Sequence, residues 1–135
     1  MKRHPQLQDL SREHHGALKL ARAARQAAES GNAGNVAALA RRVVDRFATE
    51  LDPHFRVEES GILVALARAG ETALVRRTLK EHAELRALAS AFSTAEAAES
   101  TEAAMLSRFG DLLASHVRFE ERELFEAAQS FMAAA

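Results

Sequence analysis

Two six-residue stretches, 54–59 and 116–121, are near copies of one another, and they constrain the fold of this chain more than any other feature. They read His-Phe-Arg-Val-Glu-Glu and His-Val-Arg-Phe-Glu-Glu. In each, a histidine precedes a glutamate by four residues, which places both side chains on one face of an α-helix, one turn apart. The stretches 10–14 and 78–82 also match, as Leu-Ser-Arg-Glu-His and Thr-Leu-Lys-Glu-His. This repeat indicates two related helical hairpins, each supplying a lone histidine and then a histidine–glutamate pair.

The residue types around these stretches favour helix throughout. Alanine, the best helix former, accounts for 30 of the 135 residues, whereas Val, Ile and Thr together number only 13. The turn-rich stretch 30–34 and further glycines separate the helical segments. We expect helices over 7–29, 35–59, 62–69, 71–92 and 101–121, a loose connection at 93–100, and a trailing turn or two at 124–132. Short connections favour antiparallel neighbours, so the predicted fold is all-α: a single domain, 1–135, forming an up-down-up-down antiparallel four-helix bundle.

Two positions of the second expected helix are notable. Asn35 is the expected N-cap, because an asparagine side chain can accept a bond from a free backbone N–H of the first turn. Pro53 lies inside the helix and is expected to kink it, because proline removes one backbone hydrogen bond. Two interpretations of the kink stay open: it is purely structural, or it aims the neighbouring His54.

Charge and cysteine content exclude several classes of function. The 18 basic and 19 acidic residues leave a net charge of −1, which argues against nucleic-acid and membrane-surface partners. There is no cysteine, so disulfides, thiolate metal sites and a cysteine nucleophile are excluded. No apolar run approaches the roughly 18 residues of a membrane span, and the N-terminus does not read as a signal peptide. We expect a cytoplasmic protein that is a monomer or a homodimer.

Helical phase predicts that six polar side chains face the interior. At about 100° per residue, each falls on the apolar stripe of its expected helix. They are His14, His54, Glu58, His82, His116 and Glu120. Apolar residues expected on or beside the same stripes include Leu18, Leu79 and Met105.

Such a buried set needs partners, and two explanations compete. Each polar group costs on the order of 1–3 kcal/mol if buried alone, against a net stability of about 5–15 kcal/mol for a whole domain. A closed network of His–Glu hydrogen bonds is one explanation and metal binding is the better one. Nitrogen and carboxylate donors without sulfur suit iron, manganese or zinc, and two shareable carboxylates suit two ions rather than one.

From Leu10 to about Phe125, the order of these residues resembles the hemerythrin-like domain, also called the HHE cation-binding domain. The resemblance implies a four-helix bundle around a non-haem di-iron centre, bridged by two carboxylates and an oxygen species. It further implies a ligand for each position of that centre. These are His14 and His54 for one iron, His82 and His116 for the other, and Glu58 and Glu120 as the bridges.

Two positions differ from the oxygen-carrying members that this chain resembles. The carriers have a further histidine one turn before the third-helix ligand, where this chain has Thr78. Their second bridge is an aspartate at a longer spacing, whereas Glu120 follows His116 by four residues. Both features are more similar to bacterial members that handle iron or repair iron centres. We therefore do not expect simple reversible oxygen carriage.

Two classes of function follow from this resemblance. The leading hypothesis is a di-iron protein that binds O2, NO or a related small molecule for sensing, transport or storage. The alternative is an enzyme that reduces peroxide or nitric oxide, or a donor of iron to damaged iron centres. The absence of Tyr, Trp and Cys weighs against redox turnover. A purely structural bundle is the third possibility.

The remaining polar residues near these positions are expected to lie beside the site rather than in it. His15, at the edge of the apolar stripe, is expected beside the site or on the surface, and the alternative is that it replaces the missing histidine of the carriers. Glu50 is expected as a partner of the site or an exposed residue, and His4 without a role. Four glutamates adjacent to the expected ligands in sequence lie about 100° from them and are expected to flank the site. These are Glu13, Glu59, Glu81 and Glu121.

Overall fold

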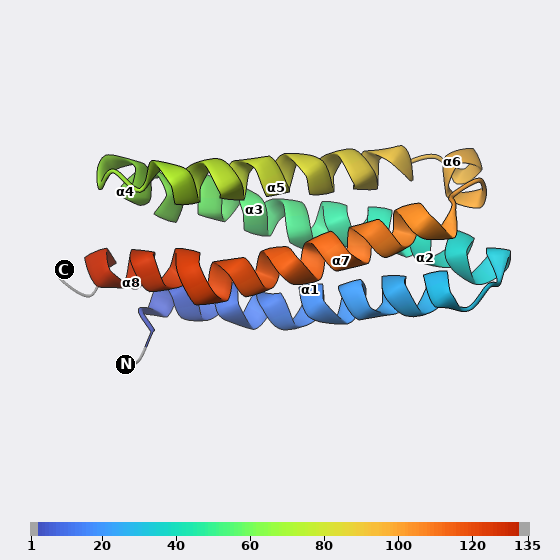
Figure 1. Ribbon diagram of the computed structural model, residues 1–135, viewed down its shortest axis with the longest axis horizontal. Coiled ribbons are helices and arrows are strands. Elements are labelled where there is room, and N and C mark those ends of the chain that lie inside the picture. The colour runs from blue at the N-terminus through green and yellow to red at the C-terminus, as the bar shows by residue number, and fades with distance from the viewer. Residues whose placement is uncertain (1–2, 133–135) are drawn as a thin grey trace.

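The computed structural model describes residues 3–132, and within that range the chain is helical and contains no strand. The all-helical prediction is thereby confirmed. The four longest helices are α1 (Pro5–Glu29), α2 (Ala33–Arg46), α5 (Thr72–Ala91) and α7 (Ala103–Phe119). They lie lengthwise along one another, with both chain ends at the same end of the molecule (Figure 1). No helix among residues 3–132 is both long and apolar enough to cross a membrane.

Two of these helices continue through a single turn of π-helix. The turn η1 (Phe47–Leu51) joins α2 to α3 (Asp52–Ser60), and η2 (Glu120–Leu124) joins α7 to α8 (Phe125–Met132). A π-turn lies just before Pro53, and the proline occupies the first turn of α3, where its missing N–H is tolerated. Such turns insert one residue into a helix and are frequent at functional sites.

Helix boundaries differ from the sequence-based expectation at two connections. The N-cap of α2 is Asn32, whose side chain accepts from the backbone N–H of Asn35 at 3.0 Å, so Asn35 lies inside the helix rather than capping it. The expected loose connection after α5 contains a short helix, α6 (Ala95–Glu99), capped by Thr94. The segment α4 (Ile62–Arg68) follows α3 as expected. Gly70, which follows α4, has a φ of 87° that glycine adopts without strain.

The apolar core consists of two clusters. The larger contains Leu20, Phe55 and Phe109, and the smaller contains Leu7, Leu66 and Phe125. The buried polar residues of α1, α3, α5 and α7 occur near the boundary between these clusters, for example His14 between Leu10 and Ala17 of α1. A layer of buried polar side chains thus divides the interior of the molecule.

Three apolar residues expected inside lie nearer the surface. The exposed fractions of Leu18, Leu79 and Met105 are 38%, 44% and 37%. Each side chain sits at the edge of its buried stripe, where a deviation of 40–60° on a helical wheel is enough to reach solvent. In the structure, the buried stripe of α1 continues after His14 through small residues, including Ala17, Ala21 and Ala24.

Small residues also let α1 and α7 approach closely. Gly110 of α7 faces α1, and a Cβ atom at that position would lie only 2.7 Å from the backbone oxygen of Ala21 and 2.8 Å from Cγ of Arg25. Glycine is therefore required by contact at this crossing, and the crossing fixes the distance between two of the helices that carry the polar layer.

Candidate metal centre

The six polar residues predicted to face the interior lie together in the structure. Each is at most 5% exposed, although they come from α1, α3, α5, α7 and the first residue of η2. They form two overlapping groups, in each of which one potential ligand atom per residue lies within 4.8 Å of all the others. The groups are His14, His54, Glu58 and Glu120, and Glu58, His82, His116 and Glu120. Two carboxylates are thus shared between two pairs of histidines.

The oxygens of each shared carboxylate point to different histidine pairs. In Glu58, Oε2 lies 3.2 Å from Nε2 of His54, and Oε1 lies 3.1 Å from Nε2 of His82. In Glu120, Oε1 lies 2.8 Å from Nε2 of His14, and Oε2 lies 3.1 Å from Nε2 of His116. Each glutamate therefore presents one oxygen to each half of the cluster, which is the arrangement that a bridge between two cations needs.

Protein hydrogen bonds leave much of this cluster unsatisfied. Within the described residues 3–132, buried atoms without a hydrogen-bond partner include Nε2 of His54, His82 and His116, both oxygens of Glu58, and Oε2 of Glu120. Leaving such atoms unpaired is costly in a packed interior. A closed His–Glu network would have satisfied them, so the structure disfavours that explanation. Nitrogen and oxygen donors converging on two points fit divalent or trivalent metal ions.

A second set of contacts fixes the orientation of the four imidazoles. Each Nδ1 faces a glutamate oxygen, and because a carboxylate only accepts, each Nδ1 carries a proton and Nε2 is directed to the interior. These pairs are His14 with Glu121 at 2.6 Å, His54 with Glu13 at 2.8 Å, His82 with Glu59 at 2.8 Å and His116 with Glu81 at 2.7 Å. The four flanking glutamates were expected beside the site, and they do lie there.

The bonds from the four flanking glutamates link the helices in a closed ring. Each glutamate bonds to a histidine of another helix and not to the histidine beside it in the sequence. Three of them are themselves anchored: Glu59 by Arg86 at 2.8 Å, Glu81 by Arg77 at 3.1 Å, and Glu121 by Ser11. The fourth, Glu13, has a side chain that is 56% exposed. This inter-helix pairing was not apparent from the sequence, because spacing along a chain does not identify neighbours across a bundle.

The central carboxylates differ in pKa in the absence of an ion. Burial and the adjacent charge of Glu120 raise the pKa of Glu58 well above its ordinary value. Burial also acts to raise the pKa of Glu120, but the charge of the adjacent His116 and the close imidazoles of His14 and His54 outweigh it and hold that pKa well below the ordinary value. Burial lowers the pKa of His116, yet Glu120 and Glu81 together more than compensate and bring it to about 9. Metal binding must therefore displace protons from the cluster.

Two phenylalanines cover the cluster, and the sequence alone did not identify their role. Phe55 stacks on the imidazole of His82 with ring centroids 3.9 Å apart, and Phe125 stacks on His14 at 5.3 Å. Both phenylalanines are almost completely buried. They hold the imidazole planes and exclude water from two sides of the site. Phe125 directly follows η2, so that π-turn positions both Glu120 and a covering ring.

The other polar residues considered in the sequence lie outside the cluster. His15 is exposed, and Glu50 accepts from Arg46 at 2.8 Å. His4, which was expected to have no role, caps α1 by accepting from the backbone N–H of Gln6 at 3.3 Å. Thr78 is fully buried, but its hydroxyl donates to the carbonyl oxygen of Leu74 at 2.8 Å and is therefore engaged within its own helix.

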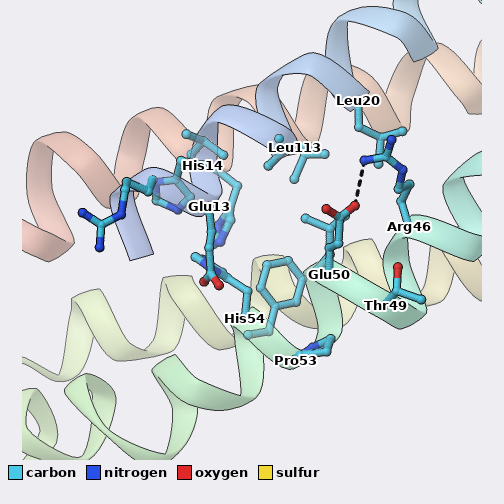
Figure 2. A pocket seen from close by; sticks show the side chains of 16 residues that line it. Glu13, His14, Leu20, Arg46, Thr49, Glu50, Pro53, His54 and Leu113 are labelled. Carbon is cyan, nitrogen blue, oxygen red and sulfur yellow. Dashed lines mark hydrogen bonds and ion pairs between the residues drawn. The ribbon is translucent and has the colours of Figure 1, made fainter. Parts of the chain in front are cut away.

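A pocket of about 300 Å³ leads from the surface to one side of the cluster. It lies between α1 and the η1–α3 segment, and Figure 2 shows His14 and His54 at one end and Arg46 at the other. The corresponding face of His82 is covered by Phe55. The pocket therefore borders His14, His54 and His116, whereas His82 does not line it.

An all-helical protein whose interior carries overlapping groups of histidine and glutamate has the features of a cation-binding domain. A family model described as the hemerythrin HHE cation-binding domain matches residues 6–128. The chain belongs to this family. No match was found among curated proteins or among solved structures.

Proposed function

We propose that this protein holds two iron ions in the buried His–Glu cluster of an up-down-up-down four-helix bundle formed by one domain. His14 and His54 would bind one ion, His82 and His116 the other, and Glu58 and Glu120 would bridge them. The observation that carries this proposal is the orientation of the two glutamates: each directs one carboxylate oxygen toward each pair of histidines. Zinc and manganese accept the same donors and are the alternatives that metal analysis must distinguish.

We further propose that the centre binds O2, NO or a related small molecule, for sensing, transport or storage in the cytoplasm. Bound iron would supply the redox-active position to which such a molecule coordinates. The protein contributes oriented imidazoles through the Nδ1 bonds and a water-poor interior beneath Phe55 and Phe125. The pocket beside His14 and His54 supports entry from one side. Neither nucleic acid nor a membrane is proposed as a partner, and a monomer or a homodimer is expected.

The position of Thr78 favours sensing or storage over reversible carriage. Its hydroxyl is bonded to Leu74 and offers no donor equivalent to the additional histidine of oxygen carriers. On the side of His82, this chain would therefore offer one imidazole fewer to a bound ion than the oxygen carriers it resembles.

Metal analysis tests the proposal directly. The protein is supplied with ferrous iron without oxygen, separated from free metal and measured for iron per chain; we expect about two. Glu58→Ala and Glu120→Ala should each lose bound iron, because each removes a bridge. Glu126→Ala is the matched control, since Glu126 lies just beyond η2 with a side chain that is 65% exposed. No bound iron in the wild type, or equal loss in all three variants, would contradict the proposal.

A further inference from the structure

The pocket beside the cluster is larger than the small molecules considered above require. Its volume is about 300 Å³. An engineered protein cavity of about 150 Å³ binds benzene, and pockets for small organic ligands begin near 300 Å³. A diatomic molecule would leave most of this space to water. The size of the pocket therefore indicates an organic molecule with at least the bulk of one aromatic ring.

The walls of the pocket are apolar in the middle. Leu20 of α1, Leu51 of η1 and Leu113 of α7 line it, and each is at most 5% exposed. The ring of Phe55 lines it as well. Buried apolar walls of this kind favour the hydrocarbon part of a ligand, because its transfer from water is worth about 25 cal/mol per Å² of apolar surface.

The outer end of the pocket carries an arginine with spare hydrogen-bond donors. Arg46 ends α2, and its Nη1 donates to Glu50 at 2.8 Å. A guanidinium has five N–H donors, and this contact uses one of them. The ion pair is half-exposed, with 40% of the Arg46 and 53% of the Glu50 side chain accessible, and pairs of this type contribute little net stability. A second carboxylate can therefore join Arg46 without dismantling a strong interaction.

The two ends of the pocket also differ in the side chains that line them. His14, His54 and His116 of the cluster line the pocket, and the carboxylate of Glu13, which also lines it, already accepts from His54. Figure 2 shows Leu113 between the end at His14 and the end at Arg46. Two arginines line the pocket, and Arg46 is the less exposed of them: 40% of its side chain is accessible, against 68% for Arg12, which pairs with Asp9.

We propose that this pocket binds a small apolar carboxylic acid, with its carboxylate on Arg46 and its hydrocarbon body between Leu20, Leu51 and Leu113. The apolar end of the bound acid then lies next to His14 and His54, so its presence or absence controls the space on the accessible side of the cluster. This goes beyond the proposed binding of a diatomic molecule. It does not depend on which metal ion the cluster holds, because the residues that recognise the acid are not the predicted ligands.

Benzoate is a suitable probe, because it joins one aromatic ring to one carboxylate. Calorimetric titration of the purified protein should show saturable binding of one benzoate per chain. Benzyl alcohol has the same ring without the charge, and acetate has the charge without the ring, so both should bind more weakly. No saturable binding of benzoate, or equal binding of benzoate and benzyl alcohol, would overturn the proposal.

Two variants locate the site. Arg46→Gln should weaken benzoate binding about tenfold, because it removes a charge-assisted hydrogen bond, whereas Arg42→Gln, an exposed arginine one turn earlier on α2, should leave it unchanged. Gly16→Leu should abolish binding, because Gly16 lines the pocket and a Cβ there meets no atom within 4 Å, so that the new side chain can enter the space. Lys19→Leu adds the same side chain to an exposed position of α1 and should have no effect. Equal effects within either pair would place benzoate elsewhere.

Titration after metal removal separates this proposal from the previous one. If the acid is held by Arg46 and the leucines, metal-free protein that retains its helical circular dichroism should bind benzoate within a few-fold of the original affinity. If benzoate instead coordinates a metal ion directly, binding should disappear with the metal and Arg46→Gln should have no effect. That result would refute the acid site while leaving the proposed metal centre intact.

Discussion

Replacing Gly110 by alanine should destabilise the protein, although alanine is the better helix former. The new Cβ would lie 2.7 Å from the backbone oxygen of Ala21 and 2.8 Å from Cγ of Arg25, and a backbone atom cannot move away as a side chain can. Overpacking of this kind costs about 1–3 kcal/mol. We take the upper part of that range here, because α1 and α7 would have to separate.

Helix propensity offsets part of this cost. Exchanging glycine for alanine within a helix is worth about 1 kcal/mol, so the net loss in unfolding free energy for Gly110→Ala should be about 2 kcal/mol. Gly16→Ala is the matched control on the opposing helix, since a Cβ there meets nothing within 4 Å. That variant should gain up to about 1 kcal/mol. The two substitutions are chemically identical and should differ by about 3 kcal/mol.

Urea denaturation followed by far-ultraviolet circular dichroism measures this difference, with metal content equalised among the samples. The comparison relies on midpoint shifts at unchanged denaturant dependence. A Gly110→Ala protein as stable as the wild type, beside a stabilised Gly16→Ala, would mean that α1 and α7 do not approach as closely as described. The reasoning that links this crossing to the position of the polar layer would then fail.

Other predictions concern the cluster itself. Metal-free protein should lose stability as the pH rises from about 6.5 to 9, on the order of 3 kcal/mol from His116 alone. The pKa of His116 is about 9 in the folded protein, so its protonated form stabilises the fold fully below pH 6.5, and that contribution disappears as the proton is lost. A flat profile of unfolding free energy against pH would contradict this. Removing the metal with a chelator should lower the Tm, and iron should restore it, unless the cluster contributes nothing to folding. Glu81→Gln should weaken metal affinity about 10–100-fold by loosening His116, whereas Glu84→Gln on the same helix should not, as competition with a coloured chelator would show. Thr78→His should slow autoxidation of ferrous protein if an open position near His82 is responsible, and unchanged autoxidation in a folded, fully loaded variant would exclude that cause.

The positions of the six central residues could be predicted from the sequence because they depend on helical periodicity alone. A histidine and a glutamate four residues apart share a face in any regular helix, and both 54–58 and 116–120 obey this rule. The burial of all six residues confirms that their side chains face the interior, as expected. Whether they ligate a metal stays a prediction.

Features that depend on contacts between helices could not be predicted in the same way. The π-turns at Phe47–Leu51 and Glu120–Leu124 shift the backbone register by one residue, and no local sequence signal distinguishes them from α-helix. The pairing of Glu13 with His54 instead of its neighbour His14 depends on which helices are adjacent and how they are rotated. The exposure of Leu79 likewise depends on the width of the buried stripe, which packing determines.

Because the four Nδ1–glutamate bonds link the helices in a closed ring, they also affect how the protein unfolds in solution. Four helical rods carry these bonds: α1, α2 continuing through η1 into α3, α5, and α7 continuing through η2 into α8. Each rod takes part in two of the bonds, once through a histidine and once through a glutamate. No rod can unfold alone without breaking both and exposing buried imidazoles. Amide hydrogens around the cluster should therefore exchange with solvent only when the whole domain unfolds, with one common free energy from α1 to α7. Such a site would be protected from partial opening by the same contacts that orient its histidines.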